Sequence, residues 1–343
     1  MLEAFRLAEA HVAIRTSMAF NVLITLCAAL IEAAFGYPHS FTRRAGHPVM
    51  WMGALIEHQE KRLNPPGLPE ARRRLNGVLA LARVLLISVI AALFLQGLAV
   101  WLLPEWLALL VIAILASTFI AQRSLHEHVG AVADALETQG LEAAREAVAK
   151  IVGRDPKALD EAGVARAAIE SLAENFSDAV VAPCLYGALL GLPGMAAYKA
   201  VNTADSMIGH RTPRYAAFGW AAAKLDDLVN LPASRLSALW LILAALLHGG
   251  ASATNALATV RKDARRHRSP NAGWPEAAIA GAIRVRLSGP RSYHGEPTDD
   301  AWIGEEGSEA TAADIRRALG LYRTACGIEI AALGLMALLI WQA

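Results

Sequence analysis

Three clusters of polar residues lie beside apolar segments, and the first of them is acidic. Glu170, Glu174 and Asp178 recur at intervals of four residues, so an α-helix would carry all three carboxylates on one face, with Asn175 beside them. Carboxylates stacked in this way repel one another unless a cation or basic groups lie opposite. The spacing is equally typical of a solvated helix face, but the segment leads directly into the apolar stretch 179–201, which favours a functional site.

The second cluster is "NTADSMIGHR" (202–211), which follows that apolar stretch. Asn202 and Asp205 are three residues apart and therefore face one way on a helix. Charged residues inside a membrane helix cost about 2.5–3.5 kcal/mol each and usually mark function, whereas a helix end at Gly209 with its charges outside the membrane would need no function. Nearby basic residues are expected to hold phosphate or carboxylate groups, namely Lys199, Arg211, Arg214, Lys224 and Arg235.

The third cluster lies in "AAAKLDDLVNLPASRL". Asp226 and Asn230 are four residues apart, and Asp227 and Asn230 are three apart, so helical spacing brings their oxygens together. Magnesium prefers such hard oxygen ligands and usually binds through one or two carboxylates plus substrate phosphates. The three residues therefore predict a magnesium site, and the alternative is a membrane-entry loop with a helix that starts at Pro232.

Three more residues are candidates for substrate binding. His47, in "GHPVMWMG", precedes an amphipathic run, although a lone histidine in a loop is more commonly structural. Asn271 and Trp274 lie in a tight turn within "HRSPNAGWPEAA", where the tryptophan ring could stack on a flat ligand. The sequence has neither a GxxxxGK[ST] loop nor a GxGxxG loop, so no standard nucleotide-binding loop is visible.

The elements that position these clusters are membrane helices. The chain has 343 residues, of which 55% are hydrophobic and 18% charged, and its net charge of +1 gives no basic field for nucleic acid. A spanning helix needs about 20 apolar residues, and 179–201 is broken by glycine and proline. We expect an all-α polytopic membrane protein with a re-entrant or broken helix, cytoplasmic helical segments and about five transmembrane helices, at 17–36, 78–103, 105–121, 236–249 and 325–341.

Basic residues set the expected orientation. Cytoplasmic loops of membrane proteins are rich in lysine and arginine, which places 37–76, 122–178 and 250–323 in the cytoplasm. We expect a single membrane-embedded domain over 1–343, multi-pass in a bacterial-type inner membrane. The three clusters are expected to form one active site that opens to the cytoplasm.

Several stretches resemble the CobD/CbiB family of cobalamin biosynthesis. They are "GHPVMWMGALIEHQEKRLN", "ENFSDAVVAPCLYG", "YKAVNTADSMIGHRTPRYAAFGWAAAKLDDLVNLPASRL" and "RKDARRHRSPNAGWPEAAIAGAIRVRLSGPRSYHG". The similarity covers most of the chain, and the block from Asn202 to Leu236 is highly specific. It departs in "FGYPHSFTRRAGHPV", where the acidic Gly-Asp-Pro of the family is absent, so no family role carries over to Tyr37.

The resemblance implies an adenosylcobinamide-phosphate synthase, an integral membrane ligase that uses ATP and Mg²⁺. Such an enzyme joins (R)-1-amino-2-propanol O-phosphate, or aminopropanol, to a carboxylate of the corrinoid adenosylcobyric acid as an amide. The implied partners are these substrates, the lipid bilayer and, as candidates, other membrane enzymes of late cobalamin assembly. A carboxylate is a poor acylating group, so activation as an acyl phosphate is expected, with Glu170 or Glu174 as the base that deprotonates the ammonium.

Two other functions fit parts of the pattern. An intramembrane prenyl-type transferase also binds magnesium diphosphate through Asp/Asn-rich helices, and it should show a second Asp-rich motif of the same kind. A non-enzymatic AmpE-like sensor of the same superfamily would keep the fold and lose the acidic residues, which are present here.

Overall fold

The computed structural model describes residues 2–37, 46–153, 155–293, 296–298 and 300–342. Most of these residues are helical. The chain forms two compact units, each assembled from separate stretches of sequence. The first unit comprises Met1–Ile120, Ala182–Val229 and Ile330–Ala343, and the second comprises Ala121–Val181 and Asn230–Glu329. The expectation of a single domain over 1–343 stays a prediction.

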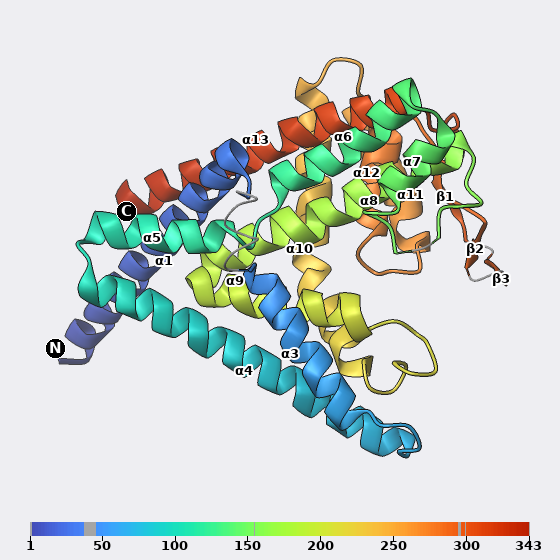
Figure 1. Ribbon diagram of the computed structural model, residues 1–343. Helices are drawn as coiled ribbons and strands as arrows, with labels where there is room; N and C mark the ends of the chain where they lie inside the picture. Colours follow the sequence, from blue (N-terminus) through green and yellow to red (C-terminus); the bar gives the residue numbers. More distant parts are fainter. Residues whose placement is uncertain (1, 38–45, 154, 294–295, 299, 343) are drawn as a thin grey trace. The chain divides into compact units, whose positions relative to one another are not determined.

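Long apolar helices make up the first unit. They are α1 (Leu2–Phe35), α3 (Pro48–Leu63), α4 (Glu70–Leu102), α5 (Glu105–Ser117) and α9 (Ala182–Ile208), together with the start of α10 (Trp220–Leu247) and the end of α13 (Ala312–Gln342). Helix α1 packs against α5 and α9, and α4 packs against α3, α5 and α9 (Figure 1). The helices expected at 78–103 and 105–121 form a tight hairpin at Pro104, because Leu103 is extended and Pro104 caps α5.

Shorter helices and two small sheets make up the second unit. The helices are α6 (Gln122–Thr138), α7 (Leu141–Val148), α8 (Glu161–Phe176), a π-helix (Ser177–Val181), α11 (Ala253–Asp263), a 3₁₀ turn (Ala264–Arg266) and α12 (Gly273–Ile283). Strands β1 (Leu287–Ser288) and β4 (Trp302–Ile303) pair antiparallel, as do β2 (Arg291–Tyr293) and β3 (Glu296–Thr298). The pair β1–β4 packs against α12, which itself packs against α11. The sequence predicts none of these strands, because each is too short to show an alternating pattern.

Six helical segments among the described residues are long and apolar enough to cross a membrane. We expected about five, and the additional one is Glu161–Ile208, which contains the broken stretch. Its apolar window is also the most buried of the six, at 72%. The long helix α4 shows the opposite pattern, because large apolar side chains such as Leu86, Ile90 and Phe94 are exposed along it. Exposed apolar rows of this kind suit contact with lipid.

The predicted break in the apolar stretch is confirmed at Gly191, inside α9. Its backbone has φ 67° and ψ −156°, a conformation that essentially only glycine adopts. Irregular backbone at membrane depth must have its polar groups satisfied by protein. Two side chains do this here, since Asn21 donates to the carbonyl of Leu189 at 3.4 Å and the Gln96 carbonyl accepts from the amide of Leu192 at 3.3 Å.

The alternative of a membrane-entry loop at Pro232 is wrong. Pro232 lies inside the continuous helix α10, which begins twelve residues earlier, at Trp220. Proline is tolerated in membrane helices when neighbouring groups satisfy the freed backbone. The third polar cluster is therefore helical throughout. Residues three or four positions apart in it do lie on neighbouring parts of the helix surface, as expected.

The break at Gly191 yields a stability prediction. A Cβ at this position would lie 2.6 Å from Oδ1 of Asn21, in a backbone conformation that disfavours side chains. Gly191→Ala should therefore cost about 1–3 kcal/mol of unfolding free energy. Thermal unfolding of the purified protein in detergent measures this. The matched control is Gly97→Ala on α4, where nothing lies within 4 Å of the added carbon, and equal melting temperatures for the two variants would contradict the account.

Candidate functional site

Residues of the second and third polar clusters meet in the first unit, between α9 and α10. The ammonium of Lys199 donates to Oδ1 of Asn202 at 3.2 Å, and Nδ2 of Asn202 lies 3.5 Å from Oδ1 of Asp226. Asp226 is only 9% exposed. A cation, an amide and a carboxylate thus form one line of polar contacts, which we call the Lys199 line. Such a line in an apolar unit gives each charge a partner.

The predicted magnesium ligands lie on two different faces of α10. Asn230 is 1% exposed and follows Asp226 by four residues, so these two share a buried face. Asp227 points about 100° away from Asp226, is 40% exposed at its side chain and forms an ion pair with Lys224 at 3.6 Å. Among the described residues, no three His, Cys, Asp or Glu side chains are grouped so as to hold a metal ion. Magnesium binding by Asp226, Asp227 and Asn230 stays a prediction.

Asp205 and the basic residues after it lie at the end of α9. A Cβ built on Gly209 would meet Oδ1 of Asp205 at 1.9 Å, so the carboxylate folds back over this glycine. The amide of Gly209 donates to the Asp205 carbonyl at 2.7 Å and closes the last turn. Arg211 follows in an exposed loop. The helix end that we weighed at Gly209 is therefore present, and the predicted roles of Asp205 and Arg211 stay predictions.

His47 begins α3 and is held by its neighbours. Its Nδ1 accepts from the amide of Val49 at 3.3 Å, and its ring meets the ring of Tyr37 edge-on with 4.9 Å between centroids. The Tyr37 hydroxyl donates to the carbonyls of Thr118 at 3.1 Å and of Ile120, which fixes this ring at the end of α5. Burial, and next the positive charge of Lys199, hold the pKa of His47 below its usual value. His47 is therefore the capping residue of α3, and Lys199 is near enough to lower its pKa.

Arg214 has a carboxylate partner that the sequence does not reveal. Its Nε and Nη2 donate to the two oxygens of Glu60 at 2.9 and 2.7 Å, and Asn64 donates to the same carboxylate at 2.9 Å. Burial raises the pKa of Glu60, but the hydrogen bonds from Arg214 and Asn64 outweigh it and leave this pKa below its usual value. The pair ties α3 to the loop before α10. Phosphate binding by Arg214 stays a prediction.

The acidic cluster of the second unit is less regular than its spacing predicts. Glu170 is 7% exposed, and its Oε1 accepts from the amide of Ser288 in β1 at 2.7 Å. Glu174 is exposed on the same helix, α8. Asp178 is half-buried in the π-helix that follows α8, and the expected single face of three carboxylates stays a prediction. Asn175 donates to the carbonyl of Ser171 at 2.9 Å.

Asn175 also lines a pocket of about 300 Å³ in the second unit. The same pocket is lined by His128, Ser124 and Lys150. The charged and polar groups of α6 and of the segment after α7 thus face a predicted catalytic residue. Lys150 is not among the residues predicted for the site, because a single lysine in a polar helical segment carries no signal of its own.

Two predicted binding residues, Asn271 and Trp274, contact a third, Arg235, in the second unit. Its Nη1 donates to Oδ1 of Asn271 at 2.9 Å, and its guanidinium lies 4.5 Å from the centroid of the Trp274 ring. One face of this tryptophan is therefore already covered by a cation, which is a favourable contact. Nearby, Nε2 of His267 lies 3.8 Å from Glu276, which is 3% exposed. His267 and Glu276 both belong to the segment "HRSPNAGWPEAA". The short distance between them in the sequence is a signal that could have predicted this contact.

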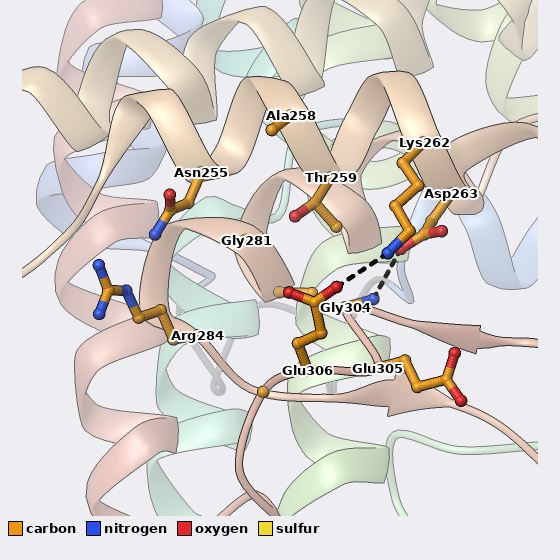
Figure 2. A pocket seen from close by; sticks show the side chains of 12 residues that line it. Asn255, Ala258, Thr259, Lys262, Asp263, Gly281, Arg284, Gly304, Glu305 and Glu306 are labelled. Atoms are coloured by element: carbon orange, nitrogen blue, oxygen red, sulfur yellow. Dashed lines mark hydrogen bonds and ion pairs between the residues drawn. The ribbon is translucent and has the colours of Figure 1, made fainter.

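The second unit has another polar pocket, of about 390 Å³, between α11, α12 and the loop after β4 (Figure 2). Lys262 reaches from α11 toward Glu306 and pairs with it at 3.2 Å, while Asp263 accepts from the amide of Gly304 at 3.0 Å. Arg284 stands at the other end, beside Asn255. None of the residues predicted for the site lines this pocket. Convergence of the three clusters on one cavity stays a prediction.

Comparisons with known proteins match this arrangement to one family. The model of the family described as "CobD/Cbib protein" matches residues 25–322. Two relatives called "Cobalamin biosynthesis protein CobD" come from Rhodobacter capsulatus, 50% identical over 90% of this chain and 95% of the relative, and from a Sinorhizobium species, 48% identical over 91% and 97%. A third, from Rhizobium meliloti, is 45% identical over 90% of this chain and 94% of the relative.

No solved structure matches the chain at a significant level. The family match extends over all three polar clusters and over the block that contains Asn271 and Trp274. The identity to the relatives holds over nine-tenths of the sequence. The chain therefore belongs to the CobD/CbiB family and has a role in cobalamin biosynthesis.

Proposed function

We propose that the protein is an ATP-dependent acid–amine ligase, an adenosylcobinamide-phosphate synthase. It would join (R)-1-amino-2-propanol O-phosphate to a carboxylate of adenosylcobyric acid and give adenosylcobinamide phosphate, whereas aminopropanol itself would give adenosylcobinamide. The observation that carries the proposal is the match to residues 25–322, within which the Lys199 line gathers a cation, an amide and a carboxylate. A corrinoid acid and a phosphate ester both need cationic and hydrogen-bonding groups of this kind.

The donor chemistry of α10 fits a magnesium ion. Asp226 and Asn230 offer two hard oxygens on one buried face, and Asp227 adds a carboxylate on the exposed side. When bound, magnesium neutralises charge on phosphate oxygens. In the proposal Lys199 and Lys224 contribute positive charge to the same phosphates, and Arg211 reaches them from the exposed loop. Binding of ATP by these residues is part of the proposal, since the sequence has no glycine-rich loop for it.

The amine must lose a proton before it attacks the activated carboxylate. Of the two glutamates on α8, Glu170 is buried and accepts a backbone hydrogen bond from β1. Glu174 is exposed and therefore able to exchange its proton with a bound substrate. We assign the role of general base to Glu174 and a positioning role to Glu170. This base is expected to act with Asn175, whose pocket also contains Lys150.

The family match favours the ligase over both alternative functions. The three relatives described above are called cobalamin biosynthesis proteins, a name that points neither to a prenyl transferase nor to a sensor. A prenyl-type transferase also needs a second Asp-rich motif, whereas α9 has Asp205 alone near its end. The acidic residues that a sensor would lose are all present.

The proposal predicts that charge on α10 is needed for turnover. Asp226→Asn keeps the size of the side chain and an oxygen that accepts from Asn202, but it removes the negative charge. By analogy with the loss of one transition-state contact, which costs about 2.7–4 kcal/mol, amide formation should fall at least about a hundredfold. Asp227→Ala should also abolish turnover while the protein stays folded in the membrane. The measurement is amide product per mole of folded protein.

The matched control for these variants is Asp155→Asn, because Asp155 is 67% exposed at its side chain and lies outside the polar clusters. It should keep normal turnover. Near-normal turnover of Asp226→Asn and Asp227→Ala would show that both residues have only a structural role. Loss of folded protein without loss of activity per folded molecule would lead to the same conclusion.

The Glu60–Arg214 pair predicts a different pattern of effects. Arg214→Ala leaves the buried Glu60 carboxylate with Asn64 and without its cation, so the melting temperature should fall. Glu60→Gln combined with Arg214→Ala should lose less than the two single changes added together. Because the folded pKa of Glu60 is lowered, this stabilisation is present above the ordinary glutamate pKa and is lost as the pH falls through the folded value. Thermal unfolding across that pH range tests it.

Kinetics separate this structural role from phosphate binding. If Arg214 holds only Glu60, the KM for the aminoalcohol phosphate should stay unchanged in the folded variant. An unchanged melting temperature with a raised KM would show that Arg214 is a phosphate ligand instead.

A further inference from the structure

A small basic pocket lies between α3 and α4 in the first unit. It has a volume of about 230 Å³, and the side chains that line it are Leu55, His58, Gln59, Arg62, Leu63, Arg83 and Ile87. Two of them are arginines and none is acidic. The two helices lie side by side along this part of the chain (Figure 1). Nothing in the proposed reaction uses this pocket.

The arginines of this pocket have no carboxylate partner among the described residues. The two glutamates nearest to them on α3 are bound elsewhere, since Glu57 pairs with Lys61 at 2.5 Å and Glu60 with Arg214 at 2.7 Å. Arg62 and Arg83 are therefore two like charges that share one pocket without a counter-charge. This arrangement is unfavourable unless an anion occupies the pocket.

The position of Arg83 indicates where that anion comes from. It lies in the apolar part of α4, about 7.5 Å along the helix axis from Val78, where that part begins. Around it the exposed side chains are apolar, with Leu86 60% exposed and Ile90 55% exposed. A row of exposed apolar side chains on a membrane helix faces acyl chains. An arginine on the same helix extends its guanidinium to the level of the lipid headgroups.

We infer that the pocket binds the phosphate of an anionic phospholipid, whose acyl chains lie along the exposed apolar face of α4. The guanidinium groups of Arg62 and Arg83 match phosphate oxygens in a bidentate geometry. Leu55 and Ile87 supply the apolar surface beside the phosphate. The pocket contains no carboxylate to receive a choline or ethanolamine group, which favours anionic headgroups such as phosphatidylglycerol over zwitterionic ones. The inference is independent of the proposed ligase activity.

The test uses the full chain purified in detergent and titrated with phosphatidylglycerol or phosphatidylcholine. Thermal unfolding and the amount of lipid retained in native mass spectra are the readouts. Phosphatidylglycerol should raise the melting temperature and stay bound, and phosphatidylcholine should do neither. The double change Arg62→Gln and Arg83→Gln should weaken the apparent affinity for phosphatidylglycerol at least tenfold. The matched control is Arg72→Gln, an exposed arginine on α4 that does not line the pocket, and it should bind like the unmodified protein.

Three results would overturn the inference. The first is an equal response to phosphatidylcholine and phosphatidylglycerol, which needs only the unmodified protein. The second is unchanged affinity in the double variant, or in Arg62→Gln alone if the double variant does not fold. The third is displacement of the lipid effect by soluble glycerol phosphate at similar concentration, which would show a site for free phosphate esters.

Discussion

The structure depends on one constraint, which is that polar groups inside apolar helices must find their partners within the protein. The break in α9 shows how this is met, because Asn21 and Gln96 bind the backbone on either side of Gly191. This arrangement allows the helix to change direction and continue toward Lys199. In the Lys199 line the partners are side chains alone. Here a cation, an amide and a carboxylate meet one another's need for polar contacts. Polar residues that are costly in lipid are thereby retained in a fixed geometry.

Ion pairs outside the apolar stretches hold loops in place. Glu60 is buried and receives both Arg214 and Asn64, so the loop before α10 is attached to α3. Both glutamates of α3 have basic partners other than Arg62, since Glu57 pairs with Lys61 and Glu60 with Arg214. The neighbouring pocket therefore keeps an unbalanced positive charge. A lipid phosphate would complete the charge balance.

The sequence predicts those features that depend on composition and on spacing within one helix. Apolar runs predict the spanning helices, glycine and proline predict the break at 179–201, and the spacing of Asp226 and Asn230 predicts their shared face. Contacts between distant residues leave no such pattern, and Glu60 and Arg214 are 154 residues apart. The π-helix at Ser177 and the helical course through Pro232 also escape prediction, because tertiary packing decides both. The sequence therefore names candidate site residues by type, but it does not show which distant residues they contact.

The central claim is that these polar residues serve amide formation between a corrinoid carboxylate and a phosphorylated aminoalcohol. The most direct measurement supplies the purified protein in detergent with adenosylcobyric acid, (R)-1-amino-2-propanol O-phosphate, ATP and Mg²⁺ and identifies the product by mass. The account predicts adenosylcobinamide phosphate, formed only when ATP and Mg²⁺ are both present. Folded protein that binds the corrinoid acid but makes no amide under these conditions would contradict it.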